Sequence, residues 1–267
     1  MEKKNKKRKL LKAAAFLTAA IFIIGLGIFA NALVGNPVSK MLAKRTANAY
    51  LEETYANTDF YIESVHYSFK LPSYTVKIKS KSSDDSYFSL EIDSLGKLLL
   101  DHYDSMVANR GNTARRLDDA YRNLTDAVWE SPSFPFTLSS GIAYGILEFT
   151  PQDYAQNSDI PSYALMQEDL ELDGLYDIQK LGRQAGHLVV YIEDDLVTTE
   201  RAAEILLEIR RLMDEAGAPF YAIDLTLQPS CAEGERPMQA GKYLTIKQFL
   251  YADIYPDGLK ERIERLH

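Results

Sequence analysis

The chain begins with a basic segment that runs directly into a long apolar segment. Residues 1–12 contain seven lysines and arginines against one acid, Glu2, and residues 13–30 are apolar except for Thr18. At about 1.5 Å per residue, a helix over residues 13–34 is about 33 Å long, enough for the roughly 30 Å hydrocarbon layer of a bilayer. Because basic flanks stay inside, we expect a single-pass plasma-membrane protein with a cytoplasmic N-terminus and an extracytoplasmic bulk.

A cleaved signal peptide is the alternative for this segment. Ala30, Asn31 and Ala32 fit a small-residue cleavage site, and cleavage near Ala32 stays open. The apolar region of a signal peptide spans about 7–15 residues, and the run here is longer, which favours an uncleaved anchor. A lipoprotein would need a cysteine at the cleavage point, and the single cysteine is Cys231.

Charge and cysteine content limit the partners and the means of stabilisation. After Lys12 the chain keeps 23 basic and 37 acidic residues, a formal charge of −14. Phosphates repel such a surface, so nucleic acid is not an expected partner, whereas the membrane and an envelope protein or peptide are. One cysteine allows no intramolecular disulfide, so the fold must depend on its apolar core.

Hydrophobic periodicity over residues 36–130 predicts a first α+β domain. Asn36 followed by Pro37 is typical of a helix start, and the helix should continue toward Tyr55. Alternating apolar residues then predict antiparallel strands with one polar face, followed by a short apolar segment and an amphipathic helix. These expected elements cover residues 65–71, 74–78, 88–92, 98–100 and 114–128.

Residues 131–137, which contain two prolines, interrupt the periodicity and are the predicted linker to a second α+β domain over residues 138–267. A strand, helix, strand pattern between residues 187 and 227 predicts a right-handed parallel crossover. The expected elements of this domain are strands 141–149, 187–193, 220–227 and 243–251 and helices 175–185, 202–216 and 259–266. The predicted fold class is therefore α+β: an N-terminal transmembrane helix followed by two small domains with mainly antiparallel sheets.

Several short motifs of the chain are similar to those of one protein family. They are GNPVSK at 35–40, KRT at 44–46, AEILLEI at 203–209, FYAID at 220–224 and YADIY at 251–255. On these residues the chain resembles the YfjL-like family of small membrane-anchored bacterial proteins. The resemblance implies the anchored topology and the two-domain plan, and it implies no activity, ligand or catalytic residue.

One acidic loop resembles the calcium-binding loop of EF-hand proteins. Oxygen ligands at alternate positions, with Gly174 sixth, suit calcium. The twelfth position is Lys180, where the loop needs a bidentate glutamate, so we expect a polar loop without metal and no cofactor. The candidate ligands in this loop are Asp169, Glu171, Asp173 and Asp177.

Other chemically capable residues form no recognisable motif. Glu193, Asp194 and Asp195 follow a predicted strand and precede a predicted helix, where they either bind a cation or solvate the turn and favour the helix N-terminus. The four histidines have no zinc-site spacing, and no nucleotide-binding or serine-nucleophile motif occurs. No catalytic residue can be named from these patterns.

Two functions remain open at this stage. The first is a binding or interaction module of the cell envelope, which recognises a protein or peptide through a sheet edge or groove. The alternative is an envelope hydrolase with a carboxylate-based site, centred on Glu193, Asp194 and Asp195. A deep polar pocket with convergent carboxylates would favour the enzyme, and a shallow or apolar groove would favour binding.

Overall fold

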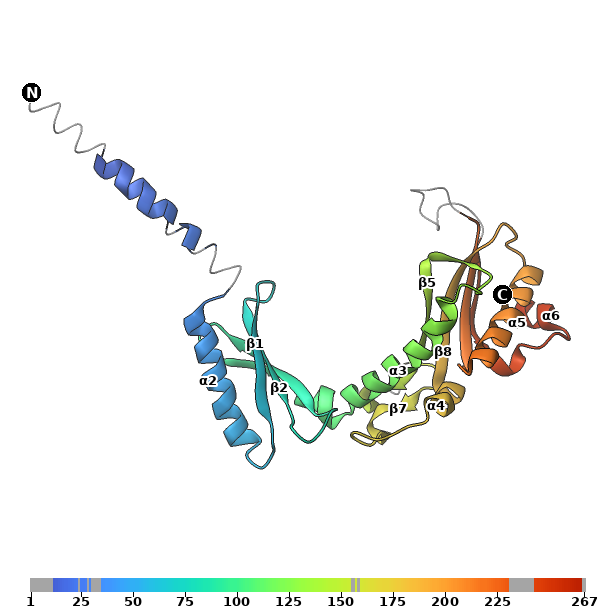
Figure 1. Ribbon diagram of the computed structural model, residues 1–267, viewed down its shortest axis with the longest axis horizontal. Helices are drawn as coiled ribbons and strands as arrows, with labels where there is room; N and C mark the ends of the chain where they lie inside the picture. Colours follow the sequence, from blue (N-terminus) through green and yellow to red (C-terminus); the bar gives the residue numbers. More distant parts are fainter. Residues whose placement is uncertain are drawn as a thin grey trace, which may run out of the picture. The chain divides into compact units, whose positions relative to one another are not determined.

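The chain folds into two compact units, Met1–Val107 and Ala108–His267 (Figure 1). The structure is a computed structural model, and it describes residues 12–23, 25–27, 29, 35–154, 157, 159–230 and 243–265. Both units combine helices with sheets that are mainly antiparallel, which confirms the predicted α+β class and the presence of two domains.

The predicted membrane segment is only partly within the described residues. Residues 12–23 and 25–27 are helical, whereas the predicted span over residues 13–34 also includes residues outside the described part of the chain. Among the residues that the structure describes, no helix has both the length and the apolar character that crossing a membrane requires. The structure therefore does not support the predicted transmembrane helix.

The N-terminal unit is a helix packed on a four-stranded antiparallel sheet with the strand order β1-β2-β3-β4. Its elements are α2 (Pro37–Thr54), β1 (Tyr61–Ser68), β2 (Ser73–Lys79), β3 (Tyr87–Asp93) and β4 (Leu98–Asp101), followed by a π-helical turn at Asp104–Ala108. Alternate strand residues face α2 and are buried, as the period-2 pattern predicted. These buried strand residues are Val65, Tyr74, Val76, Ile78, Phe88, Leu90 and Ile92.

The start of α2 is fixed to the sheet by the first of the family-like motifs. The Asn36 side chain accepts a hydrogen bond from the Val38 backbone amide at 2.8 Å, so Asn36 is the predicted N-cap. The Tyr74 hydroxyl accepts from the Asn36 amide at 2.8 Å and donates to the Asn36 carbonyl at 2.9 Å. Gly35 has φ of +77°, and a Cβ there would lie 2.7 Å from the Tyr67 ring. Only glycine fits this position without strain.

The C-terminal unit contains a second four-stranded sheet with the strand order β10-β9-β8-β5. Strands β8 and β9 are parallel and joined through α5, as the predicted crossover requires, and the other two pairings are antiparallel. A short parallel pair, β6 and β7, lies outside this sheet. The helices and strands are α3 (Gly111–Trp129), β5 (Thr137–Leu147), β6 (Phe149–Thr150), β7 (Leu165–Met166), α4 (Ile178–Ala185), β8 (Gly186–Glu193), α5 (Thr199–Ala216), β9 (Ala222–Gln228), β10 (Leu244–Leu250) and α6 (Leu259–Glu264).

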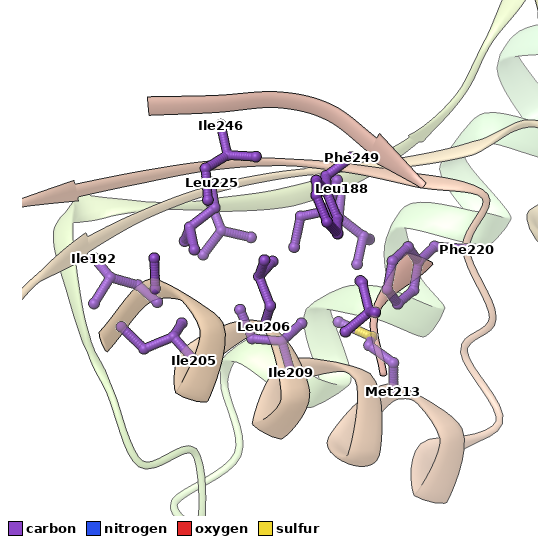
Figure 2. Close-up of a cluster of buried hydrophobic side chains, with 14 of the residues drawn as sticks. Leu188, Ile192, Ile205, Leu206, Ile209, Met213, Phe220, Leu225, Ile246 and Phe249 are labelled. Atoms are coloured by element: carbon purple, nitrogen blue, oxygen red, sulfur yellow. The ribbon is translucent and has the colours of Figure 1, made fainter. Parts of the chain in front are cut away.

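The core of the C-terminal unit lies between α5 and one face of this sheet (Figure 2). The apolar stripe of α5 points at side chains of β8, β9 and β10, and all of these residues are almost completely buried. α5 ends at Gly217, whose φ of +64° is the left-handed conformation expected of a glycine after a helix. The labelled core residues are Leu188, Ile192, Ile205, Leu206, Ile209, Met213, Phe220, Leu225, Ile246 and Phe249.

The boundary between the units differs from the predicted one. The sequence placed residues 36–130 in one domain and the linker at 131–137, whereas α3 belongs to the C-terminal unit. The reason is the packing of Tyr121, whose hydroxyl donates to the Pro219 carbonyl at 3.0 Å. The ring of Tyr121 also lies against Gly145 and Gly186, where a Cβ would clash. Residues 131–137 therefore connect α3 to β5 inside one unit.

Candidate functional site

A buried histidine at the start of β8 is held between two carboxylates from other segments. His187 Nδ1 lies 2.6 Å from Glu148 Oε1, and His187 Nε2 lies 3.0 Å from Asp224 Oδ1. Alternation along β8 directs His187 away from the core formed with α5, and the parallel register places Asp224 of β9 on the same side. We call Glu148, His187 and Asp224 the histidine cluster.

The backbone around the histidine cluster is held by hydrogen bonds between segments. Glu148 follows β5, and its amide donates to the Ala185 carbonyl at 2.9 Å while its carbonyl accepts from the Leu165 amide at 2.8 Å. Asp224 Oδ1 also accepts from the Gln248 amide at 2.6 Å. The cluster therefore joins segments from β5 to β10 at one end of the sheet.

Charge pairing in the cluster favours the protonated histidine. Burial lowers the pKa of His187, but the hydrogen bonds and negative charges of Asp224 and Glu148 outweigh burial and raise this pKa to about 9. For Asp224, burial raises the pKa, but hydrogen bonds from His187 and from the Gln248 amide bring it below its usual range. His187 is thus an imidazolium at neutral pH.

Two tyrosines adjoin the histidine cluster. The Tyr163 ring packs edge-on against the His187 ring at 6.2 Å and tilted against the Tyr221 ring at 4.6 Å. The Tyr163 hydroxyl is buried and has no hydrogen-bond partner among the described residues. Burial and the nearby charges of Glu148 and Asp224 raise the pKa of Tyr163, so this hydroxyl stays protonated.

The geometry of the cluster suits a clamp better than a catalyst. Both ring nitrogens of His187 are engaged, so the ring has no nitrogen left to accept a proton from a substrate. The carboxylates lie on opposite sides of the imidazole and do not converge on a common point. Within the described residues, no three His, Cys, Asp or Glu side chains are arranged to hold a metal ion. The cluster ties three chain segments together.

A pocket of about 350 Å³ is lined by Tyr221, whose ring packs on Tyr163 beside this cluster. Its walls come from α4, from the end of α5, from the segment that leads into β9 and from the end of β10. The apolar wall residues are Met213, Pro219, Phe220, Leu250, Tyr251 and Ala252. Hydrogen bonds fix this wall, because the Tyr221 amide donates to the Gly186 carbonyl at 2.7 Å and the Tyr251 amide donates to the Tyr221 carbonyl at 2.8 Å. We call this site the α4–β10 pocket.

Two charged side chains, Asp214 and Arg183, also line the α4–β10 pocket. The Tyr251 hydroxyl is 3.0 and 3.1 Å from the two carboxylate oxygens of Asp214, and Arg210 Nε is 3.8 Å from Asp214 Oδ2. Arg183 lies in the last turn of α4 and is exposed. The pocket therefore combines apolar walls with one carboxylate, Asp214, whose charge is balanced by Arg210 and the Tyr251 hydroxyl, and one exposed guanidinium, that of Arg183.

The acidic loop that resembles an EF-hand serves the local fold in the structure. Asp177 caps α4, because its side chain accepts from the Lys180 amide at 3.1 Å. The Glu171 carbonyl accepts from the Gly174 amide at 2.9 Å, which closes a tight turn. Asp169 ends a short 3-10 helix, and Asp173 takes a left-handed φ of 57° in the turn. These four residues are not among any group that could hold a metal in the described part of the chain.

The second acidic group, at the end of β8, is held by a helix and its own turn. Asp194 accepts from the Leu196 amide at 2.9 Å and from Arg201 Nε at 2.8 Å. Burial raises the pKa of Asp194, but the Leu196 amide and Arg201 bring it below its usual range. The structure joins Asp194 to α5, and among the described residues neither Glu193 nor Asp195 belongs to a group of His, Cys, Asp or Glu side chains that could hold a metal ion. The predicted alternative of a carboxylate-based site therefore gains no geometric support from this part of the chain.

Sequence reasoning missed the histidine cluster. His187 and Glu148 are 39 positions apart, and His187 and Asp224 are 37 positions apart, so no spacing motif connects them. The available signal was Asp224 itself, the single ionisable residue in the strand Ala222–Gln228. His66 is exposed on β1 and bonds Ser64 Oγ at 2.9 Å, and Cys231 lies outside the described residues.

Comparison with known proteins identifies the family of this chain but no individual curated protein or solved structure that is similar to it. Residues 8–100 match the model of the YfjL-like N-terminal domain, and residues 121–264 match that of the YfjL-like C-terminal domain. No curated protein and no solved structure matches the chain. The two matches follow each other in the order of the two units, and the second alone covers more than half of the chain. This protein therefore belongs to the YfjL-like family, whose biochemical role is unknown.

Proposed function

We propose that this chain is a single-pass membrane protein whose extracytoplasmic C-terminal unit binds a ligand in the α4–β10 pocket. The anchor part of the proposal rests on the basic head and on the surface of the first helix. Its large apolar side chains are between 54 and 78 % exposed, and such a surface needs lipid or protein around it. These side chains are Phe16, Leu17, Ile21, Phe22, Ile23, Leu26 and Phe29.

The polar group inside the apolar run is compatible with a bilayer. Thr18 is the one polar residue between Ala13 and Ala30, and its hydroxyl donates to the Ala14 carbonyl at 3.0 Å. A hydroxyl bonded to its own helix carries little cost in lipid, where each unsatisfied polar group is expensive. This supports membrane insertion of the segment.

The proposed anchor would join the N-terminal unit without a flexible linker. Asn36 is two residues beyond the end of the proposed span, and both its amide and its carbonyl are bonded to the Tyr74 hydroxyl. Gly35 packs against the Tyr67 ring one residue earlier. The span at residues 13–34 would therefore hold the N-terminal unit close to the outer membrane–water interface.

The proposal of binding, as opposed to catalysis, rests on the hydrogen bonds that the charged groups at and near the α4–β10 pocket already make within the protein. At the pocket, Asp214 accepts the hydrogen bond of the Tyr251 hydroxyl, and in the neighbouring histidine cluster both nitrogens of His187 are hydrogen-bonded inside the protein. Acid–base and nucleophilic catalysis need a group that is free to exchange a proton or attack. Apolar walls with one exposed cation are instead typical of a binding pocket.

The anchor is tested with a C-terminal tag on the full chain. After removal of the cell wall, external protease should destroy the tagged protein while the undigested, full-length chain sediments with membranes. A variant with Ile21→Arg and Ile23→Arg should leave the membrane fraction, because each buried arginine costs about 3 kcal/mol in a bilayer. Release of a shortened wild-type chain, or its full protection from protease, would contradict the proposal.

Ligand binding in the pocket is tested by photocrosslinking in cells. A short aliphatic diazirine amino acid at Ala252, on the pocket rim, adds less bulk than phenylalanine and should form one dominant adduct after illumination. The same amino acid at Leu196, which is 61 % exposed in the same unit, is the matched control and should not form it. Identical adducts from both positions would show that the pocket is not the binding site.

A further inference from the structure

The α4–β10 pocket has features that define the chemistry of its ligand. This inference rests on the proposed binding function and narrows it to a ligand class. We propose that the pocket takes a small carboxylate with an apolar body, and that the Arg183 guanidinium binds the carboxylate. The terminal carboxylate of a peptide and a free carboxylic acid both have this chemistry.

The apolar walls select the body of the ligand. Met213, Phe220 and Leu250 supply aliphatic and aromatic surface to the pocket. The Phe220 and Tyr251 rings meet edge to face, with centroids 5.1 Å apart and an interplanar angle of 88°. Aromatic pairs in this geometry are rigid and favourable, so the wall is formed before a ligand arrives. A preformed apolar wall favours an apolar group that needs little reorganisation.

The negative charge at the pocket is already neutralised. Tyr251 donates its hydroxyl to Asp214, and the Arg210 guanidinium lies 4.2 Å from the centre of the Tyr251 ring and 3.8 Å from Asp214. Arg210 also donates to the Ile254 carbonyl, which holds it in place. Asp214 therefore has its own cation and hydrogen-bond donor, and it neither requires a cationic ligand nor strongly opposes an anionic one.

Arg183 is the charge that the pocket leaves available. It is exposed on the last turn of α4, and its guanidinium has no hydrogen bond or ion pair with any of the residues that the structure describes. A guanidinium binds a carboxylate through two parallel hydrogen bonds, a geometry that fits few other groups. An unpaired arginine beside an apolar wall thus matches a carboxylate attached to an apolar group.

The size of the pocket limits the ligand. Its volume of about 350 Å³ is near the lower end of the roughly 300–1,000 Å³ range of small-molecule sites. A single amino-acid side chain with its carboxylate, or a short acid, fits such a volume better than a long acyl chain. We therefore expect recognition of one terminal residue or one small acid.

The experiment titrates the full chain in lipid nanodiscs and follows binding by ligand-observed NMR. The probes are N-acetyl-leucine for a peptide terminus, 3-phenylpropanoate for a free acid, and N-acetyl-leucinamide as the uncharged counterpart. At least one acid should bind, and the amide should bind at least tenfold more weakly, since charge-assisted hydrogen bonds contribute about one to two orders of magnitude in affinity. The acid that binds more tightly identifies the source of the carboxylate.

Three variants test whether the probes bind in the α4–β10 pocket. Arg183→Gln should weaken the acid at least tenfold, whereas Lys180→Gln, which removes an exposed cation one turn earlier on α4, should leave the affinity unchanged. Ala252→Phe adds bulk at the pocket rim and should block every probe. Urea unfolding followed by Trp129 fluorescence should be close to wild type for all three, which separates lost binding from lost folding.

The outcomes separate the ligand class from the proposed function. If the amide binds as tightly as the acids, or Arg183→Gln binds the acid like wild type, while Ala252→Phe still blocks binding, the pocket is a ligand site but the carboxylate class is wrong. If no probe binds and photocrosslinking at Ala252 matches the surface control, both the class and the proposed function fail.

Discussion

Replacement of His187 should remove a pH dependence of stability that the histidine cluster creates. The folded pKa of about 9 is above the value of 6.5 for an unperturbed histidine. A raised folded pKa means that the stabilisation is complete below pH 6.5 and is lost as the pH rises through about 9. The difference corresponds to about 3 kcal/mol, since one pKa unit is about 1.4 kcal/mol.

The Asp224 carboxylate has the opposite dependence. The pKa of Asp224 is below its usual range in the folded state, so its contribution is present above the ordinary aspartate pKa and is lost as the pH falls through the folded value. The cluster should therefore stabilise the C-terminal unit most between about pH 4 and 6.5. Stability should decline on both sides of this interval.

The assay uses the single tryptophan of the chain, Trp129. It is 6 % exposed, belongs to the core of the C-terminal unit and packs edge to face on Phe134 at 5.4 Å. Its fluorescence therefore reports unfolding of this unit separately from the N-terminal unit. Urea titrations of the full chain in nanodiscs between pH 5.5 and 9.5 should show a loss of about 3 kcal/mol in the free energy of unfolding.

Two variants decide whether His187 causes the loss. His187→Gln leaves Glu148 and Asp224 without their cation, which should cost about 3–5 kcal/mol at pH 6 and abolish the decline between pH 6.5 and 9.5. His66→Gln makes the same change at an exposed histidine of the N-terminal unit and should keep the wild-type profile. If His187→Gln declined as steeply as wild type over this range, the charged clamp would be refuted.

Two glycine substitutions test the packing of the units. Gly186→Ala should destabilise the C-terminal unit by about 2 kcal/mol in the Trp129 assay, because the new Cβ would lie 2.5 Å from the Tyr121 hydroxyl oxygen; a wild-type free energy of unfolding would contradict this packing. Gly35→Ala should destabilise the N-terminal unit by more than the roughly 1 kcal/mol cost of a left-handed alanine, measured by circular dichroism in urea. Gly141→Ala, with φ of +67° and open space around it, is the control for that backbone cost, and equal losses from both substitutions would refute the clash at Gly35.

Local signals in the sequence predicted most of the elements. Asn36 and Pro37 begin α2, and Gly217 ends α5 in the left-handed conformation that its type favours. The apolar period of β8, α5 and β9 predicted the parallel crossover, and alternation predicted the polar outer face of the first sheet. Such signals depend on hydrogen bonds and side-chain directions within a few residues, so they are readable without the tertiary structure.

The domain boundary was not readable in this way. The pattern of α3 predicts an amphipathic helix but says nothing about which sheet its apolar stripe covers. The Tyr121 hydroxyl donates a hydrogen bond to the Pro219 carbonyl, 98 positions later in the sequence. The Tyr121 ring fits there because Gly145 and Gly186 have no side chain. The prolines near residue 135 marked a real break between elements, but that break lies inside a domain.

The sequence by itself determined the basic and apolar N-terminal segment, the α+β class, the order of helices and strands and the family resemblance, because each is a property of neighbouring residues or composition. The tertiary structure alone decided that Glu148, His187 and Asp224 meet, that Asp214 is neutralised by Tyr251, and that Arg183 faces an apolar pocket. These depend on strand register and helix packing between segments some 30 to 40 positions apart or more. A one-residue change of register would move His187 and Asp224 to opposite faces of their sheet, and the histidine cluster would not form.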